Sequence, residues 1–200
     1  MANLPVRLEE RPNAEFMSPT GKVPFLKLQS FLVSEFLPVV DFLAKRNVKL
    51  SAGLTDLERG DMHAHMALFD DILKNVEVTK CRYGSVYLFP LNLILPRVKW
   101  REVNNYLTAV DWKSKSQECV MDLADRCFKS MSSKLDHNEY FFGDSPTELD
   151  ALAFGHFYTI LTTELPNMEL KNCLRRYSNL TEFCQRIDKK YFVPGTEAKK

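Results

Sequence analysis

The stretch Ser145–Leu165, SPTELDALAFGHFYTILTTEL, decides the fold of this chain. Thr147 is placed to cap a helix, and Asp150 follows three residues later, where its carboxylate can reach back to the amide of the cap. Apolar residues then occur on nearly every side of the expected helix: Leu149, Ala151, Leu152, Ala153, Phe154, Phe157, Tyr158, Ile160 and Leu161. Because a helix without a polar face lies inside a bundle, the stretch predicts the central helix of a helical domain. Asp150 is then a buried carboxylate that needs amide partners.

Further helical patterns lie on both sides of this stretch. Apolar residues recur at helical spacing in residues 55–74, 100–112, 116–135, 168–177 and 179–191. The sequence therefore predicts a helical domain of about five or six helices over residues 49–192, followed by a loose polar tail over 193–200. Residues 76–96 are apolar but irregular, and Pro90 and Pro96 argue against a long helix there.

The first 48 residues show a different pattern, with alternating apolar residues followed by one helix. Short strands are expected at Leu4–Leu8, Lys22–Leu28 and Phe31–Val33, and a helix at 35–45. Pro24 near the start of a strand requires an edge position or an unusual peptide bond. Residues 1–48 thus predict a small part with mixed α and β structure, joined to the helical domain around residues 47–54.

The composition limits the classes of function. The 200 residues are 45% hydrophobic with a formal net charge of +1, which suits one compact body and shows no basic stripe for nucleic acid. Five cysteines without a CxxC pair indicate a reducing compartment and no disulfide framework. The N-terminal residues lack the apolar segment of a signal peptide, and no transmembrane helix is visible. Any membrane association is therefore expected to be peripheral or through a partner.

Several segments resemble known proteins. SPTGKVPFL at residues 18–26 resembles the stretch before the third strand of glutathione-transferase-like proteins, where the proline is cis, so a cis Val23–Pro24 bond is implied. The helix start with Thr147 and Asp150 resembles the capping motif of that superfamily. AEFMSPTGKVPFL, TELDALAFGHFYTILTTEL and YSNLTEFCQRIDKKYF closely resemble the metaxin family, in particular its metaxin-2 branch, and the likeness extends over nearly the whole chain.

The resemblance implies both a fold and a role. The fold class is α+β and mostly α, glutathione-transferase-like, with a truncated thioredoxin-like N-terminal part and an all-helical C-terminal domain. Metaxins lie at the cytosolic face of the mitochondrial outer membrane and work with the sorting and assembly machinery that inserts β-barrel proteins. We therefore expect a non-catalytic subunit without cofactor or metal, whose partners are a metaxin-1-like protein and an outer-membrane β-barrel assembly component. The alternatives are a glutathione-dependent transferase and an adaptor that links mitochondria to transport machinery.

The chain departs from the superfamily pattern at its N-terminal end. The first strand and first helix of the thioredoxin-like half are missing from the sequence, so Leu4–Leu8 has no neighbouring strand. We expect a loose N-terminus through about Pro12, or pairing with another chain. The missing helix would carry the Tyr, Ser or Cys that activates glutathione. At Ser34-Glu35 the family's Glu-Ser pair is reversed, so a carboxylate would repel that of glutathione.

The most prominent candidate for partner binding is the apolar segment before residue 96. Its residues are Val86, Tyr87, Leu88, Phe89, Leu91, Leu93, Ile94 and Leu95. A large apolar patch marks an interface when it is exposed, but apolar loops more often pack into clusters beneath the helices. His63 and His65 point to different faces of a helix and cannot easily share a metal ion.

Overall fold

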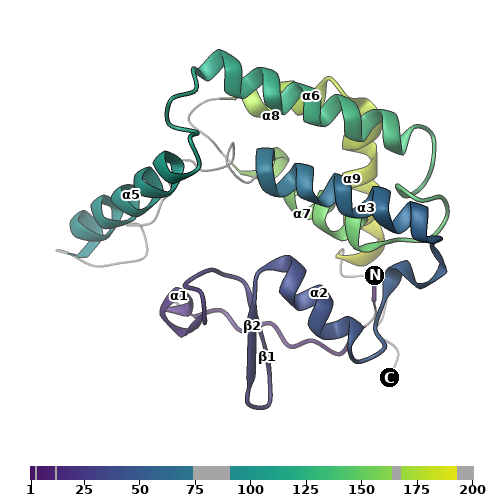
Figure 1. Cartoon of the computed structure of the whole chain (residues 1–200), viewed down its shortest axis with the longest axis horizontal. Coiled ribbons are helices and arrows are strands. Elements are labelled where there is room, and N and C mark those ends of the chain that lie inside the picture. Colours follow the sequence, from purple (N-terminus) through teal and green to yellow (C-terminus); the bar gives the residue numbers. More distant parts are fainter. Residues whose placement is uncertain (3, 12, 74–90, 164–167, 193–200) are drawn as a thin grey trace.

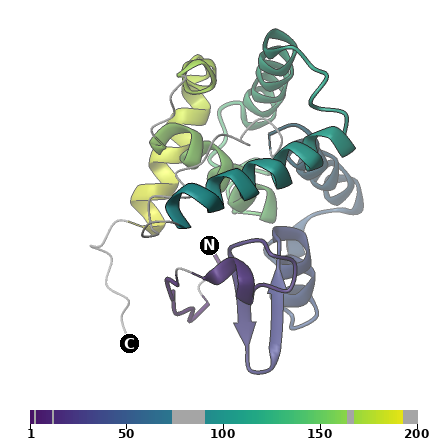
Figure 2. The ribbon, with the colours of Figure 1, turned by 90° about the vertical axis from the view of Figure 1, so that its left-hand side faces the viewer.

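The computed structural model describes residues 1–2, 4–11, 13–73, 91–163 and 168–192, with only the backbone over 91–99. These residues form a small N-terminal part and a larger helical part, which lie one below the other in Figures 1 and 2. The N-terminal part contains α1 (Ala14–Met17), β1 (Phe25–Leu28), β2 (Phe31–Ser34) and α2 (Phe36–Ala44). The helical part contains η1 (Leu50–Gly53), α3 (Asp56–Leu68), η2 (Phe69–Leu73), α5 (Leu91–Ala109), α6 (Gln117–Leu135), α7 (Glu148–Thr162), α8 (Glu169–Arg175) and α9 (Ser178–Tyr191).

The N-terminal part is built on a single antiparallel hairpin. Leu28 lies opposite Phe31 across a tight turn, in which Gln29 has a positive φ of 53°. Helix α2 packs on this hairpin, and the ring centroids of Phe31 and Phe42 lie 5.9 Å apart. The peptide bond between Val23 and Pro24 at the entry to β1 is cis, as the resemblance implied.

Helix α7 is the centre of the helical part, as its apolar sequence predicts. It packs against α3, α8 and α9. The Phe157 ring lies 5.5 Å from that of Phe69 and 5.9 Å from that of Phe128, and all three side chains are fully buried. The helix is apolar on nearly every side, and its exposed side includes Thr159, whose hydroxyl donates to the Gly155 carbonyl.

The predicted strand at Leu4–Leu8 does not form. These residues have no assigned strand structure, and Val6 and Leu8 are exposed by 66% and 85%. The sheet that the described residues form has two strands, β1 and β2, and Leu4–Leu8 is not one of them. A strand needs a neighbour for its backbone hydrogen bonds, so an alternating pattern alone does not produce one.

The prediction against a helix before Pro96 was wrong for its last residues. Helix α5 begins at Leu91, includes Pro96 and ends at Ala109, so it starts nine residues before the expected Trp100. A proline removes one amide and crowds the carbonyl four residues earlier. Pro96 is the sixth residue of α5, so only its first turn precedes the proline. The amide that Pro96 lacks would have bonded to the carbonyl of Asn92, so the helix continues past the proline with one hydrogen bond fewer near its start.

Candidate functional site

The start of α7 is a buried polar junction. Asp150 is fully buried, and its Oδ2 accepts hydrogen bonds of 2.7 Å from both the amide and the hydroxyl of Thr147. Its Oδ1 accepts a 2.9 Å bond from the amide of Phe141. Burial raises the pKa of Asp150, although these bonds to Thr147 and Phe141 act in the opposite direction. Asp150 therefore fixes both the helix start and the loop before it.

The neighbouring Glu148 connects this junction to η1, at the start of the helical part. Its Oε1 accepts hydrogen bonds from the amides of Leu50, at 2.9 Å, and Ser51, at 3.3 Å. Both residues belong to η1, which follows α2 in the chain. The sequence prediction singled out Thr147 and Asp150 but missed Glu148, because nothing in the pattern reveals a bond to residues 97 and 98 positions away.

The positions expected to contact glutathione are occupied by internal contacts. Ser34 is 4% exposed, and its Oγ lies 2.8 Å from Oγ1 of Thr20. Glu35 precedes α2 with a φ of 68°, and its Oε2 accepts a 2.8 Å bond from Nζ of Lys22. The hydroxyl and the carboxylate thus hold the cis-proline loop against the start of α2.

Three of the thiols are buried, and their pKa is shifted away from that of a nucleophile. Burial raises the pKa of Cys127 and of Cys184 to about 12, and burial also raises the pKa of Cys173. Cys119 is exposed, and Cys81 lies outside the described residues. The described residues also contain no group of three or more His, Cys, Asp or Glu side chains that could hold a metal ion.

An open hollow of about 500 Å³ lies between the two parts. It is lined by Leu37 of α2, by His63, Met66 and Ala67 of α3, and by Asp70 and Asp71 of η2. Its volume is in the range of small-molecule sites. Two carboxylates in its wall disfavour an anionic ligand such as glutathione.

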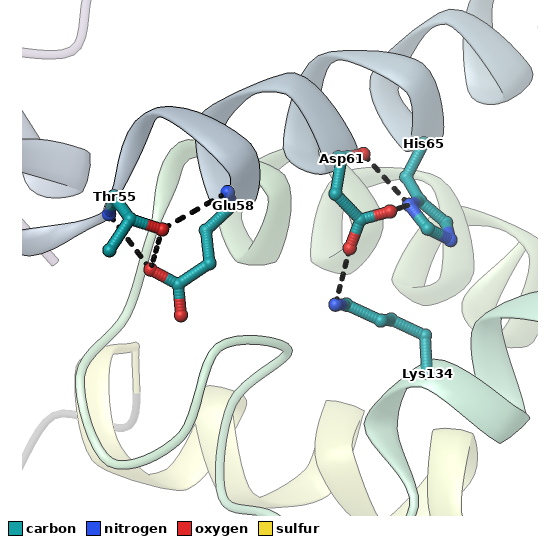
Figure 3. A network of polar contacts seen from close by, with 5 residues as sticks. All are labelled: Thr55, Glu58, Asp61, His65 and Lys134. Carbon is teal, nitrogen blue, oxygen red and sulfur yellow. Dashed lines mark hydrogen bonds and ion pairs between the residues drawn. The ribbon is translucent and has the colours of Figure 1, made fainter.

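A polar network links α3 to α6 (Figure 3). Thr55 and Glu58 form a capping box at the start of α3, which the sequence analysis missed although the Thr-x-x-Glu signal is present. One turn further along, Oδ2 of Asp61 accepts a hydrogen bond from Nζ of Lys134. The His65 Nδ1 lies 3.1 Å from Oδ1 of Asp61. The hydrogen bond from Lys134 lowers the pKa of Asp61.

This lowered pKa predicts a pH dependence of stability. A carboxyl group whose pKa is lower in the folded state stabilises the fold above its unfolded pKa, and that contribution is lost as the pH falls through the folded pKa. We expect acidification from about pH 4 to pH 2 to lower the melting temperature less in Asp61→Asn than in the wild type. The melting temperatures of both proteins, measured by thermal unfolding across this pH range, test the prediction. Asp144→Asn, at an exposed position, should follow the wild-type curve, and a parallel curve for Asp61→Asn would contradict the assignment.

The predicted partner-binding segment cannot be placed. Val86, Tyr87, Leu88 and Phe89 lie outside the described residues, and Leu91, Leu93, Ile94 and Leu95 lie in α5 with undescribed side chains. The structure also exposes apolar side chains on both faces of the N-terminal hairpin and at its entry, which the sequence analysis did not identify. We call this set the hairpin surface, and its exposed members are Val23, Leu28, Phe31 and Leu32. The Arg46 guanidinium lies 3.7 Å from the Phe42 ring and 5.7 Å from the Phe31 ring.

Comparisons with known proteins agree with this architecture. The model of the glutathione S-transferase N-terminal domain matches residues 1–84, and that of the glutathione S-transferase C-terminal domain matches 124–187. Metaxin-2 of Homo sapiens is 42% identical over 205 residues, which cover 96% of this chain and 78% of that protein. The chain belongs to the metaxin family. The metaxin-2 homolog of Caenorhabditis elegans is 40% identical over 175 residues, covering 81% and 76% of the two chains.

Comparisons with a more distant relative and with a solved structure extend this result to the fold. Human metaxin-1 is 29% identical over 197 residues, which cover 88% of this chain and 42% of that protein. The solved structure of NaGST-2 matches with a TM-score of 0.56 at 14% identity, covering 94% of this chain and 81% of that one. The metaxin thus has the predicted glutathione-transferase-like fold, mostly helical, with a two-stranded sheet among the described residues of its N-terminal part. None of its described helices is long and apolar enough to cross a membrane.

Proposed function

We propose that this metaxin is a non-catalytic subunit of the mitochondrial outer-membrane sorting and assembly machinery, at the cytosolic face, where it aids protein import and β-barrel insertion through protein contacts. The observation that carries the proposal is the 42% identity to metaxin-2 over 96% of the chain. The internal use of Ser34 and Glu35 supports it, because these groups are already bonded to Thr20 and Lys22.

We infer that the partners are a metaxin-1-like protein and an outer-membrane β-barrel assembly component. The hairpin surface supports a protein partner, since four large apolar side chains of one hairpin and its entry are exposed there. We assign this surface to the metaxin-1-like partner.

The function is tested by measuring β-barrel assembly. Mitochondria from cells depleted of this metaxin should assemble an imported outer-membrane β-barrel precursor more slowly, while import of a soluble matrix precursor continues at the normal rate. Re-expression of the chain should restore assembly. Normal assembly after complete depletion would contradict the proposed role.

A glutathione-dependent transferase is the second candidate, supported by the fold and by the hollow between α2 and α3. Binding of glutathione to the folded state would raise the melting temperature by mass action. The acidic wall of the hollow and the occupied positions near Pro24 predict no rise at millimolar glutathione. A clear rise would favour the transferase.

A further inference from the structure

Helix α5 departs from the rest of the helical part. Figure 1 shows it extending away from the bundle, and Figure 2 shows it crossing in front of the other helices. Its last turn is anchored, since Leu107 packs against the core and the Trp112 amide donates to the Leu107 carbonyl at 2.8 Å. Among the described elements, the pairs that pack along their length do not include α5. Within the described residues, Leu107 is thus the point at which α5 packs on the core.

An apolar stripe runs along the end of α5. Trp100, Val103 and Leu107 recur at spacings of three and four residues and share one face, and Val110 follows just after the helix. Leu107 packs against the core, but Trp100 is 55% exposed two turns away, and Tyr106 and Val110 are exposed as well. An exposed apolar face of this kind marks a binding surface.

The charges around the stripe indicate what kind of molecule binds it. Residues 97–115 contain five basic and two acidic side chains, a net charge of +3 in a chain of net +1. Arg101 follows Trp100 directly and is exposed. A helix with aromatic residues on one face and basic residues beside it suits the interface of an anionic membrane. Tryptophan and tyrosine prefer that depth, and basic side chains reach the phosphate groups.

We propose that three exposed side chains, Trp100 and Tyr106 of α5 and Val110 just after its end, bind an anionic lipid surface directly. Trp100 and Tyr106 enter the headgroup region, and Arg101 contacts lipid phosphates. This site goes beyond the proposed function, because it requires no protein partner. Its failure in a test with lipid alone leaves the assembly role untouched.

The test uses the purified full chain and vesicles of phosphatidylcholine, alone or mixed with phosphatidylinositol. The chain has two tryptophans, and Trp112 is buried, so a change in emission on binding comes from Trp100. We expect the chain to float with the anionic vesicles and its emission to move to shorter wavelength. Trp100→Phe should still float while losing most of the spectral change. High salt should release the chain.

Charge and polarity variants complete the test. Trp100→Glu should weaken vesicle binding about tenfold or more, since it removes the burial of a large apolar side chain. Arg101→Glu should weaken binding to the anionic vesicles about fivefold or more, because a contact with an anionic surface is lost. Leu57→Glu, at an exposed position of α3, is the matched control and should bind as the wild type does.

Two results would overturn the proposal. The first is failure of the wild-type chain to float with either kind of vesicle. The second is equal vesicle binding by the wild type and Trp100→Glu. A loss of metaxin-1 capture by Trp100→Glu without any vesicle binding by the wild type would instead assign this face to a protein.

Discussion

Replacing Asp150 with alanine is expected to lower the free energy of unfolding by about 3 kcal/mol, because buried donors of Thr147 and Phe141 lose their acceptor. The loss is partly offset, since burial raises the pKa of Asp150 and its charge is costly in the folded state. For a chain of this length, the melting temperature should fall by roughly 6–12 °C. Urea unfolding followed by circular dichroism measures the change.

Two matched variants separate the causes of this loss. Asp144→Ala changes an exposed carboxylate in the same loop and should alter the free energy of unfolding by less than about 0.5 kcal/mol. Asp150→Asn keeps one acceptor oxygen and removes the charge, so it should recover part of the stability. If Asp150→Ala unfolds like the wild type, the polar junction does not stabilise the fold.

Replacing Phe31 with glutamate is expected to reduce capture of the metaxin-1-like partner roughly thirtyfold, as for a central aromatic of an interface. Phe31 is 53% exposed on the hairpin surface, so the substitution leaves the buried core intact. Arg46 lies beside the Phe31 ring and can pair with the new carboxylate, which favours a folded variant. Quantitative capture of the partner by tagged chains measures the effect.

Leu57→Glu is the control for this prediction. Leu57 is 86% exposed on α3 and is not part of the hairpin surface. The Leu57→Glu variant should capture as much of the metaxin-1-like partner as the wild type. Circular dichroism should show that Leu57→Glu and Phe31→Glu are both folded. Equal capture by Phe31→Glu and Leu57→Glu would remove the hairpin surface from the interface.

The sequence predicted those features that depend on local patterns. The capping box of Thr147 and Asp150 has a fixed spacing, and the stripes of α6 and α9 repeat every three to four residues. The cis bond before Pro24 followed from resemblance to a longer motif, not from the physics of the residues themselves.

The features that the sequence missed depend on contacts over long distances in the chain. The bond from Glu148 to η1 joins residues 98 positions apart. The hairpin surface became visible only when β1, β2 and α2 left Phe31 and Leu32 uncovered. The apolar residues themselves do not reveal which of them the fold leaves exposed.

Affinity capture of the tagged chain from gently solubilised mitochondria tests the central claim most directly. The proposed role predicts that a metaxin-1-like protein and an outer-membrane β-barrel component are recovered together, in amounts unchanged by added glutathione. Recovery of neither protein by a folded chain, combined with retention on immobilised glutathione, would contradict the role as an assembly subunit and favour the transferase.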